Sequence, residues 1–411
     1  MLQDKLLRVA FTSVVKCGTL EVVTSRGPVL KFGNGGLPQV TIRFADAGAG
    51  WALCLDPELK LGELYMDGRL LIERGTFLDF LQLVLQDSRG EFEAAPLRGL
   101  RRALTWARRI ANANPAVRSS QKVAHHYNRD GRLFDLFLDS DRQYSCAYFD
   151  APDTPLEAAQ AAKKRHIIAK LLVEPGQSVL DIGSGWGGLA MSLVEWAGAG
   201  HVRGITLSEE QLAVSRQRAA ERGLCDRIAF ALEDYRATQG TFDRIVSVGM
   251  FEHLGVSAYD AYFKACRRLL KKDGIMLLHA IGRSGRPYPT NPWIARYIFP
   301  GGHLPALSEM TRAIDRAGLV VTDIEVLRLH YAYTLKAWRE RFMAHREDAR
   351  QLYDERFCRM WECYLAISEA AFRFQDAIVF QVQLARRNDT VPLTRGYIAA
   401  REDALSVVAD S

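Results

Sequence analysis

Residues 179–188 read VLDIGSGWGG, an apolar run that leads directly into a group of glycines. Gly183, Gly185 and Gly188 stand in G-x-G-x-x-G spacing, and the residues that follow, LAMSLVEWAG, read as a helix. Glycines let the backbone approach a ligand closely, and the N-terminus of the following helix offers free N–H groups. This stretch therefore predicts a nucleotide-binding turn between a strand and a helix.

The sequence on both sides of this turn alternates between helical and strand-like segments. We expect helices at 156–172, 189–198 and 209–223, and strands at 178–183, 201–207, 228–234, 242–250 and 274–282. Regular alternation of this kind predicts an α/β fold with a Rossmann-like, doubly wound and mostly parallel sheet. Such a sheet binds its ligand at the carboxyl ends of its strands.

The N-terminal part of the chain has a different pattern. Short β-like runs at 20–25, 29–34 and 39–46 alternate with glycine-rich turns, and an apolar stretch at 77–85 reads as a helix. This pattern predicts a smaller α+β domain without recognisable catalytic spacing. Docking, dimerisation and lipid contact are the roles we expect for it.

The chain of 411 residues suits two domains. We place the N-terminal domain at 1–95, a basic helical linker at 96–120 and the larger domain at 121–400. After Tyr331 the chain reads as mainly helical and rich in aromatic residues, which we expect to form core. These aromatic residues are Trp338, Phe342, Tyr353, Phe357, Trp361, Tyr364, Phe372 and Phe374.

The composition excludes several classes of protein. The chain has no uninterrupted apolar run of about 18 residues, which a membrane-spanning helix requires. Its N-terminus carries an early acidic residue, Asp4, and lacks the pattern of a secretory signal. The seven cysteines are scattered without CxxC or Cys/His spacing. We therefore expect a cytoplasmic protein with reduced thiols and no structural zinc or other metal.

Positive charge is concentrated in one segment. The formal net charge is +6, and residues 97–132 contain nine Lys or Arg against one acid, including Arg101, Arg102, Arg108 and Arg109. Anionic lipid headgroups and nucleic acid would both be attracted to such a segment. A solvated, charged linker helix is the plain alternative.

Two features indicate which nucleotide the glycine turn binds. Asp181 comes just before the glycines, where a carboxylate suits the cationic amino group of a methionine moiety and would repel a pyrophosphate. The second strand ends at Ile205-Thr206, without the acid that a dinucleotide ribose usually meets. Ser208 and Gln211 have capping-box spacing, so the acids between them start a helix. S-adenosylmethionine is therefore favoured over a nicotinamide dinucleotide.

Several ordered motifs between His126 and Arg386 together resemble the cyclopropane-fatty-acyl-phospholipid synthases and the related mycolic acid cyclopropane synthases. They are YSCAYF (144–149), VLDIGSGWGGLA (179–190), ITLSEEQ (205–211), DRIVSVGMFEHLG (243–255), LLHAIG (277–282), WIARYIFPGGHLP (293–305) and ERFCRMW (355–361). The N-terminal region resembles, more loosely, the extra domain of the phospholipid-acting members. One stretch departs from the family: the pattern H-Y-D-x-G-N-D is replaced by HYNRDGR at 126–132, with Asn128 and Arg132 in place of acids.

The resemblance implies a class I methyltransferase fold with S-adenosylmethionine at the carboxyl edge of the sheet and helical insertions that hold an acyl chain. The implied cofactor-binding residues, with Asp181 and Gly185 from the glycine turn, are Tyr144, Ser145, Gly183, Thr206, Gln211, Asp234 and Tyr235. The family also holds a bicarbonate ion beside the reacting carbons. Its implied ligands are Cys146, Glu252, His279, Ile281 and Tyr331, of which the cysteine and the isoleucine contribute backbone groups.

These residue types suit the implied reaction. An alkene is a weak nucleophile, so it must be held in line with the sulfonium methyl group and away from water. Methyl transfer leaves a carbocation, and ring closure needs a base that removes a proton from the added methyl group. His279 and Tyr331 can donate hydrogen bonds to a buried bicarbonate, and Glu252 can accept one from its OH. Aromatic faces of the C-terminal helices can stabilise positive charge.

Each of these residues also has a plain interpretation. Cys146 reads equally as a nucleophile or as a small buried residue, although no Cys-His arrangement is evident. Glu252-His253 reads as an ordinary helix start, and His279 as a core histidine with its hydrogen bonds satisfied. Within the set of matching motifs, the functional interpretation is favoured.

The resemblance therefore implies a peripheral enzyme, a homodimer, that acts on unsaturated phospholipids at the inner face of the membrane. A relative that gives a methylene- or methyl-branched chain is the nearest alternative. A methyltransferase for small soluble molecules would not need the N-terminal domain or the basic segment. A lipid-binding protein with a relic methyltransferase fold belongs to another class, and the intact motifs argue against it. Nucleic-acid methylation is least favoured, because the basic residues lie outside the catalytic motifs.

Overall fold

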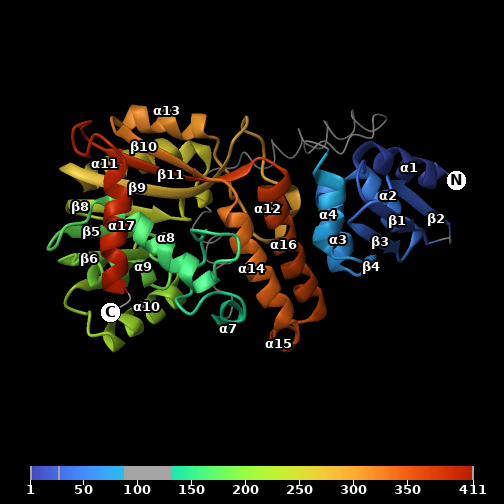
Figure 1. Ribbon diagram of the computed structural model, residues 1–411, viewed down its shortest axis with the longest axis horizontal. Coiled ribbons are helices and arrows are strands. Elements are labelled where there is room, and N and C mark those ends of the chain that lie inside the picture. The colour runs from blue at the N-terminus through green and yellow to red at the C-terminus, as the bar shows by residue number, and fades with distance from the viewer. Residues whose placement is uncertain (1, 26–27, 88–130, 410–411) are drawn as a thin grey trace. The chain divides into compact units, whose positions relative to one another are not determined.

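The computed structural model describes residues 2–25, 28–87 and 131–409. The chain divides into two compact units (Figure 1). The first contains residues up to 115 together with 289–300 and 335–376, and the second contains 116–288, 301–334 and 377–411. The predicted linker at 96–120 and the basic side chains that precede Arg132 lie outside the described residues.

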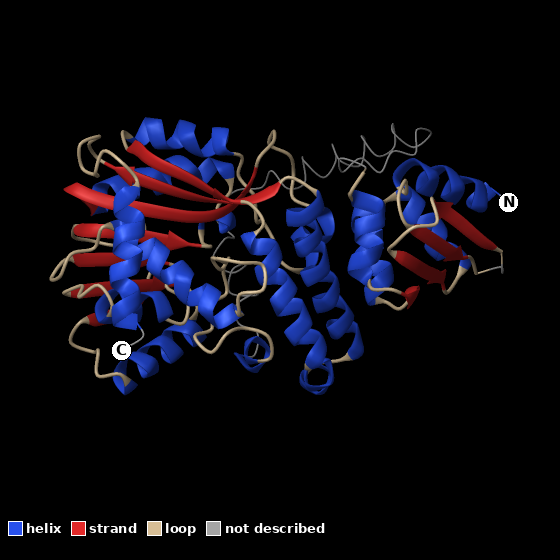
Figure 2. Cartoon of the chain, in the orientation of Figure 1, coloured by secondary structure: helices blue, strands red, loops and turns tan. Residues whose placement is uncertain are grey.

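The second unit is built on a sheet of seven strands in the order β10-β11-β9-β8-β5-β6-β7. The strands are drawn in red in Figure 2. The strands from β7 to β9 run parallel, and β11 runs antiparallel to both of its neighbours, β9 and β10. Their bounds are β5 Ser178–Ile182, β6 His201–Thr206, β7 Ile228–Leu232, β8 Phe242–Val248, β9 Leu270–Arg283, β10 Val320–Leu327 and β11 Ala377–Ala385. This confirms the predicted doubly wound, mostly parallel sheet, and all five predicted strands are present.

Helices cover both faces of this sheet (Figure 1). Successive strand residues point to opposite faces, so Leu180 packs in a core with α11 and α13, while Val179 packs in a second core with α8, α9 and α17. The bounds are α7 Gly131–Asp135, α8 Leu156–Leu171, α9 Gly188–Glu195, α10 Glu209–Glu221, α11 Tyr259–Leu269, α13 Leu307–Ala317 and α17 Gly396–Ala409. The three predicted helices are thus confirmed as α8, α9 and α10.

The order of the strands places a switch point beside β5. The chain moves outward from β5 through β6 to β7, then returns to β8 on the other side of β5 and moves outward to β9. Ligands of doubly wound sheets bind at the carboxyl ends of the strands beside such a reversal. Here the carboxyl end of β5 leads into the glycine turn, and that of β8 leads into Glu252.

The chain after Tyr331 is mainly helical, as predicted, but it also contains a strand that the sequence pattern did not reveal. Residues 377–385 form β11 between β9 and β10. This strand reads AIVFQVQLA and is buried on both faces, so its apolar residues do not alternate with exposed polar ones. Periodicity alone cannot distinguish such a strand from a buried helix.

The first unit contains a smaller sheet with the strand order β2-β1-β3-β4. The bounds are β1 Thr19–Val23, β2 Val29–Gly33, β3 Gln39–Phe44, β4 Leu70–Arg74, α1 Leu2–Val14, α2 Ala47–Leu55, α3 Pro57–Met66 and α4 Phe77–Leu85. The three predicted strands and the helix at 77–85 are confirmed. The helix begins with a capping box, because Thr76 and Asp79 each accept a hydrogen bond from the other's backbone N–H.

Later segments of the chain pack on this small domain within the same unit. They are α12 Pro292–Tyr297, α14 His330–Ala344 from residue 335, α15 Arg346–Leu352 and α16 Glu355–Phe374. The indole Nε1 of Trp293 donates to the Met66 sulfur at 3.1 Å, and α16 packs against α3 and α4. Trp338 and Trp361 are fully buried, as predicted for core aromatic residues. No helix in the described ranges is long and apolar enough to cross a membrane.

Candidate active site

The glycine turn is held against the end of β6. The backbone N–H groups of Gly183 and Ser184 both donate to the carbonyl of Ile205, at 2.9 and 3.0 Å. Gly185 has φ +54°, and a Cβ built on it would meet no atom within 4 Å, so a ligand can approach the backbone there. Gly188 differs, because a Cβ there would lie 2.3 Å from an oxygen of Asp141. The third glycine therefore serves close packing.

Asp181, at the end of β5, is a buried carboxylate with an unused oxygen. The residue is 2% exposed, and its Oδ2 has no hydrogen-bond partner among the residues that the structure describes. Burial raises the pKa of Asp181 to about 7, although the Lys163 ammonium opposes this shift. A buried acceptor without a partner is unfavourable, and a cationic ligand would satisfy it. The site thus fits the amino group of a methionine moiety.

A buried lysine organises the predicted residues that precede Cys146. Lys163 of α8 donates to Gln143 Oε1 and, at 3.0 Å, to the hydroxyl of Ser145. Its burial lowers the pKa of the ammonium to about 8. The ring of Tyr144 lies edge-on to Phe134, with ring centroids 5.3 Å apart. Lys163 and Gln143 are residues that our sequence analysis missed, since two adjacent lysines in a helix usually indicate a solvated face.

Thr206 and Gln211 meet at the end of β6. The Thr206 hydroxyl donates to Gln211 Oε1 at 2.8 Å, and the Gln211 backbone N–H donates to the Ser208 side chain at 3.3 Å. This N-cap confirms that Ser208 starts the helix α10. Asp234 is held by the Arg236 side chain, which lowers the pKa of the carboxyl. The ring of Tyr235 lies edge-on to Tyr262.

Glu252 lies in the short 3₁₀ helix η3 (Phe251–His253) after β8, and a second 3₁₀ turn, η4 (Val256–Ala258), follows it. Its Oε1 accepts a hydrogen bond from the backbone N–H of Ile281 on β9. The resemblance assigns this N–H group to bicarbonate, but here it is already paired with Glu252. Its Oε2 is buried and has no partner in the described part of the chain. Burial raises the pKa of Glu252 to about 7, so the carboxyl can hold a proton near neutral pH.

His279 is also buried, at 2% exposed, and its two ring nitrogens have different surroundings. Nδ1 lies 3.2 Å from the side-chain amide of Gln381, while Nε2 has no partner within the described ranges. Burial lowers the pKa of His279 to about 3, and the Lys163 and Lys170 ammonium groups add to the shift. The ring is therefore neutral at physiological pH.

Cys146 and Tyr331 come from segments that the structure brings together. The backbone N–H of Ala147 donates to the Thr334 hydroxyl at 3.0 Å, and both Cys146 and Tyr331 are buried. Burial raises the pKa of the Cys146 thiol, which donates weakly to the Ala147 carbonyl. A protonated, buried thiol does not act as a nucleophile, so the plain interpretation of this side chain is favoured.

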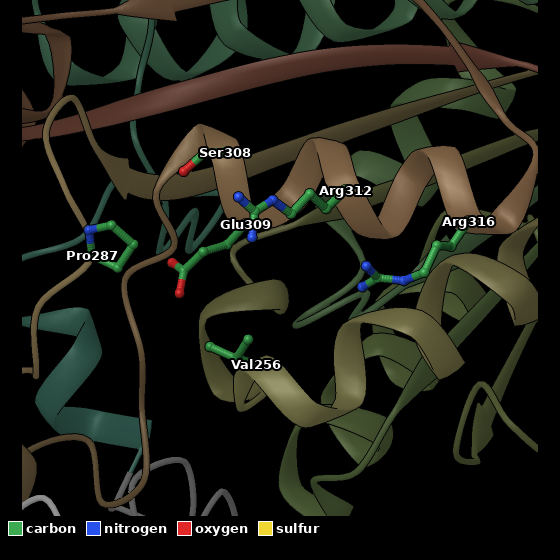
Figure 3. Close-up of a pocket in the computed structure, with 6 residues that line it drawn as sticks. All are labelled: Val256, Pro287, Ser308, Glu309, Arg312 and Arg316. Atoms are coloured by element: carbon green, nitrogen blue, oxygen red, sulfur yellow. The ribbon is translucent and has the colours of Figure 1, made fainter.

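A separate pocket of about 390 Å³ lies beside α13 (Figure 3). Its lining residues are Val256, Pro287, Ser308, Glu309, Arg312 and Arg316, and none of them is a predicted site residue. Glu309 accepts the backbone N–H of Ala306, and Arg316 pairs with Asp260. Two of its charged groups are therefore already engaged within the protein.

Comparison with known proteins gives consistent matches. Residues 115–382 match the family model described as mycolic acid cyclopropane synthetase. The chain is 40% identical over 334 residues to cyclopropane-fatty-acyl-phospholipid synthase of Escherichia coli (strain K12), covering 80% of this chain and 83% of that protein. It is 40% identical over 312 residues to tuberculostearic acid methyltransferase UfaA1 of Mycobacterium tuberculosis, covering 69% of this chain and 71% of that protein.

Solved structures agree with these matches. The structure of mycolic acid cyclopropane synthase CmaA1 complexed with SAH and CTAB is similar to this one, with a TM-score of 0.61 and 34% identity. The likeness covers 64% of this chain and 97% of that one.

Proposed function

Because this chain belongs to the mycolic acid cyclopropane synthetase family, we propose that it is a cyclopropane-fatty-acyl-phospholipid synthase. It transfers a methylene unit from S-adenosylmethionine to the cis double bond of an unsaturated acyl chain in a phospholipid. The observation that carries the proposal is a pair of buried polar atoms without partners among the described residues, Glu252 Oε2 and His279 Nε2. Each of these atoms could form a hydrogen bond with a small oxyanion such as bicarbonate, which both accepts and donates through its oxygens.

S-adenosylmethionine would supply an electrophilic methyl group. The carboxylate of Asp181 binds its amino group, and the open backbone at Gly185 admits the methionine moiety. In this proposal the remaining cofactor contacts come from Tyr144, Ser145, Gly183, Thr206, Gln211, Asp234 and Tyr235. Because the Asp234 carboxylate is held by Arg236, a ligand hydroxyl there would share it with the guanidinium.

Closing the ring requires removal of a proton from the added methyl group. His279, as a neutral ring, donates from Nε2 to an oxyanion at this place without carrying charge of its own. Glu252, with a pKa of about 7, either accepts a hydrogen bond from the oxyanion or holds a proton itself. Tyr331 and the backbone of Cys146 complete the proposed bicarbonate site, while the Ile281 N–H acts by fixing Glu252.

The phospholipid substrate implies work at the membrane surface. We propose that the protein is cytoplasmic and associates peripherally with the inner face of the membrane, through the basic segment 96–120 and the N-terminal domain 1–95. A homodimer formed through the N-terminal domain belongs to the same proposal. Lys and Arg near an anionic surface each contribute roughly 1 kcal/mol of attraction.

A second candidate product rests on one of the relatives. The similar protein UfaA1 is a tuberculostearic acid methyltransferase, so a methyl- or methylene-branched chain is the alternative outcome. The reactions share the transfer of a methyl group to an alkene. The methylene product differs in which proton is removed afterwards, and a saturated methyl branch would also need a hydride donor to reduce that alkene.

Lipid mass spectrometry tests the proposal. We would express the chain in cells that make no cyclopropane fatty acids and compare it with Glu252→Gln. The control is Glu309→Gln, which changes a helix-capping carboxylate outside the predicted site. We expect monounsaturated chains to gain one CH₂ and lose the double bond with wild type and control, but not with Glu252→Gln. A CH₂ gained with an alkene retained would indicate a methylene product, and unchanged lipids would indicate a soluble acceptor.

A further inference from the structure

His279 lies in a row of polar side chains that crosses three neighbouring strands. Gln381 of β11 is the direct cross-strand partner of His279 on β9 and also of Glu325 on β10. Direct cross-strand partners point to the same face of a sheet. The three side chains therefore form one row, Glu325, Gln381 and His279, in which Gln381 and His279 are almost completely buried.

Lys170 of α8 covers this row and determines how the Gln381 amide is oriented. Its ammonium, which is 0% exposed, donates to Gln381 Oε1 at 3.0 Å and also pairs with Glu325. An ammonium group has donors only, so the carbonyl end of the amide must face Lys170. The NH₂ end must then face His279. The orientation thus follows from the chemistry of the neighbours rather than from the similar shapes of the two ends.

The amide in turn determines the tautomer of His279. An NH₂ group can only donate, so Nδ1 of His279 must be the acceptor and carry no proton. The proton of the neutral ring is therefore on Nε2, the buried nitrogen without a partner among the residues described. A charged ring would place Nδ1–H against the amide NH₂, donor against donor, and the lowered pKa of His279 agrees with this.

The lysine is itself held from several sides. Glu325 also lies 2.7 Å from His166 Nε2, and His166 Nδ1 lies 2.6 Å from Glu402 of α17. Lys170 lies 3.8 Å from Asp323 as well. Because Lys170 is buried, moving its ammonium would take a buried charge away from these partners, so its position is strongly restricted.

We propose that Gln381, oriented by Lys170, is a positioning residue that keeps the His279 proton on Nε2, where the ring donates to a bound oxyanion. This inference rests on the proposed function for the identity of the oxyanion. The tautomer itself depends only on the hydrogen bonds of the row. In the other tautomer the ring would present a lone pair to the anion, and the two would repel each other.

The variant Gln381→Glu tests the inference with almost no change in shape. A carboxylate accepts a hydrogen bond, so it favours a proton on Nδ1 of His279. The control is Gln383→Glu. In wild type, Gln383 lies two residues along the same buried strand, opposite Leu277, and its side-chain amide donates to the Lys170 carbonyl and to the Tyr397 hydroxyl. The substitution places the same charge in the same strand without a contact to His279.

The tautomer is measured by ¹⁵N NMR of the full chain with labelled histidine. The His279→Gln variant identifies the signals of His279. In parallel, kcat and KM are measured on phospholipid vesicles. We expect the proton on Nε2 in wild type and Gln383→Glu, and on Nδ1 in Gln381→Glu. In Gln381→Glu we expect kcat to fall by roughly 10²-fold or more, which is the size of rate effects in general acid–base catalysis, with a much smaller change in KM. If Gln381→Glu does not fold, Gln381→Met removes the donor and should give a mixture of tautomers.

Two results would overturn the inference: a proton on Nδ1 in wild type, or a kcat within about twofold of wild type after the tautomer has changed. Failure of the proposed function gives a different result. In that case wild type makes no cyclopropane product, yet its His279 proton is on Nε2 and moves in Gln381→Glu.

Discussion

Asp181, Glu252 and His279 each bury a polar side-chain atom that has no hydrogen-bond partner in the described part of the chain. A buried polar group of this kind costs roughly 1–3 kcal/mol of folding free energy. All three lie at or near the carboxyl ends of adjacent parallel strands, where ligands of doubly wound sheets bind. The protein therefore carries a stability cost at the place where its ligands would satisfy these atoms.

Asp181→Asn should separate the cost of this side chain to folding stability from its contribution to ligand binding. The raised pKa means that the unfolded chain loses the Asp181 proton near pH 4, whereas the ligand-free folded chain loses it near pH 7. The folded state then binds more protons between these values, so the contribution of Asp181 to stability falls as pH rises from about 4 to 7. We expect the free energy of unfolding of the variant, relative to that of wild type, to increase between pH 5 and pH 8 by on the order of 1–3 kcal/mol. Urea unfolding without ligand measures this difference.

The same variant should bind S-adenosylhomocysteine more weakly by calorimetry, by roughly 10- to 100-fold, the value of a hydrogen bond to a charged group. Asp243→Asn is the control, because the pKa of Asp243 is lowered in the folded chain whereas that of Asp181 is raised. Burial opposes ionisation of Asp243, but Lys271 and Ser178 lower its pKa to about 2. Its loss should destabilise the protein equally at pH 5 and pH 8, above both of its pKa values. Equal pH profiles for the two variants would contradict our account of Asp181.

At the scale of elements, α8 connects the two parts of the predicted site. Its Lys163 holds the segment before Cys146, and its Lys170 holds the row that contains His279. Most helices that cover a sheet bury one apolar stripe, but α8 buries lysines and a histidine as well. The packing of this helix thus sets the positions of polar groups on both the loop and the sheet.

Gly62→Ala tests how closely α12 approaches α3 in the first unit. A Cβ at Gly62 would lie 2.4 Å from Nε1 of the fully buried Trp293, and the indole cannot move without losing contacts. We expect a loss of roughly 1–3 kcal/mol in the free energy of unfolding, the usual cost of overpacking. The control, Gly396→Ala in α17, meets no atom closer than 4.0 Å and should change stability little. Equal effects of both variants would show that the Trp293 contact is not limiting.

At the scale of the whole molecule, residues far apart in sequence share the first unit. α16 packs against α3 and α4, and Arg356 at the start of α16 pairs with Asp67 at 2.8 Å. Trp293 of α12 also packs on α3. The small N-terminal domain thus buries apolar surface of helices that come almost 300 residues later.

A chain shortened to residues 131–411 should reveal this dependence. Removal of α3 and α4 would uncover the apolar face of α16 and the indole of Trp293, and exposed apolar surface of this kind promotes aggregation. We expect increased binding of a hydrophobic dye and loss of a single species in gel filtration, compared with the full chain. Removal of α1 alone, which packs against α2 and α4, should have a weaker effect on the dye signal. A stable, monodisperse fragment that binds no more dye than the full chain would contradict this expectation.

Local patterns were sufficient to predict the central part of the fold. The run at 179–188 predicts a strand, a turn and a helix, because apolar runs, glycines and helix starts are signals carried by neighbouring residues. The same holds for the strands of the parallel sheet and for the N-cap at Ser208. The site residues that were named from motifs remain predictions. For Asp181, Glu252 and His279, burial and a polar atom without a partner in the described part of the chain support the proposed roles.

The partners of those residues depend on tertiary structure. Gln381 meets His279 across 102 positions of sequence, on a strand that the pattern did not distinguish from a helix. Lys163 and Lys170 were not singled out from the sequence, and their burial follows from the packing of α8. Motifs thus identify the side chains that could react. Protonation, tautomer and orientation depend on burial and on non-local hydrogen bonds, which exist only once the strands are paired.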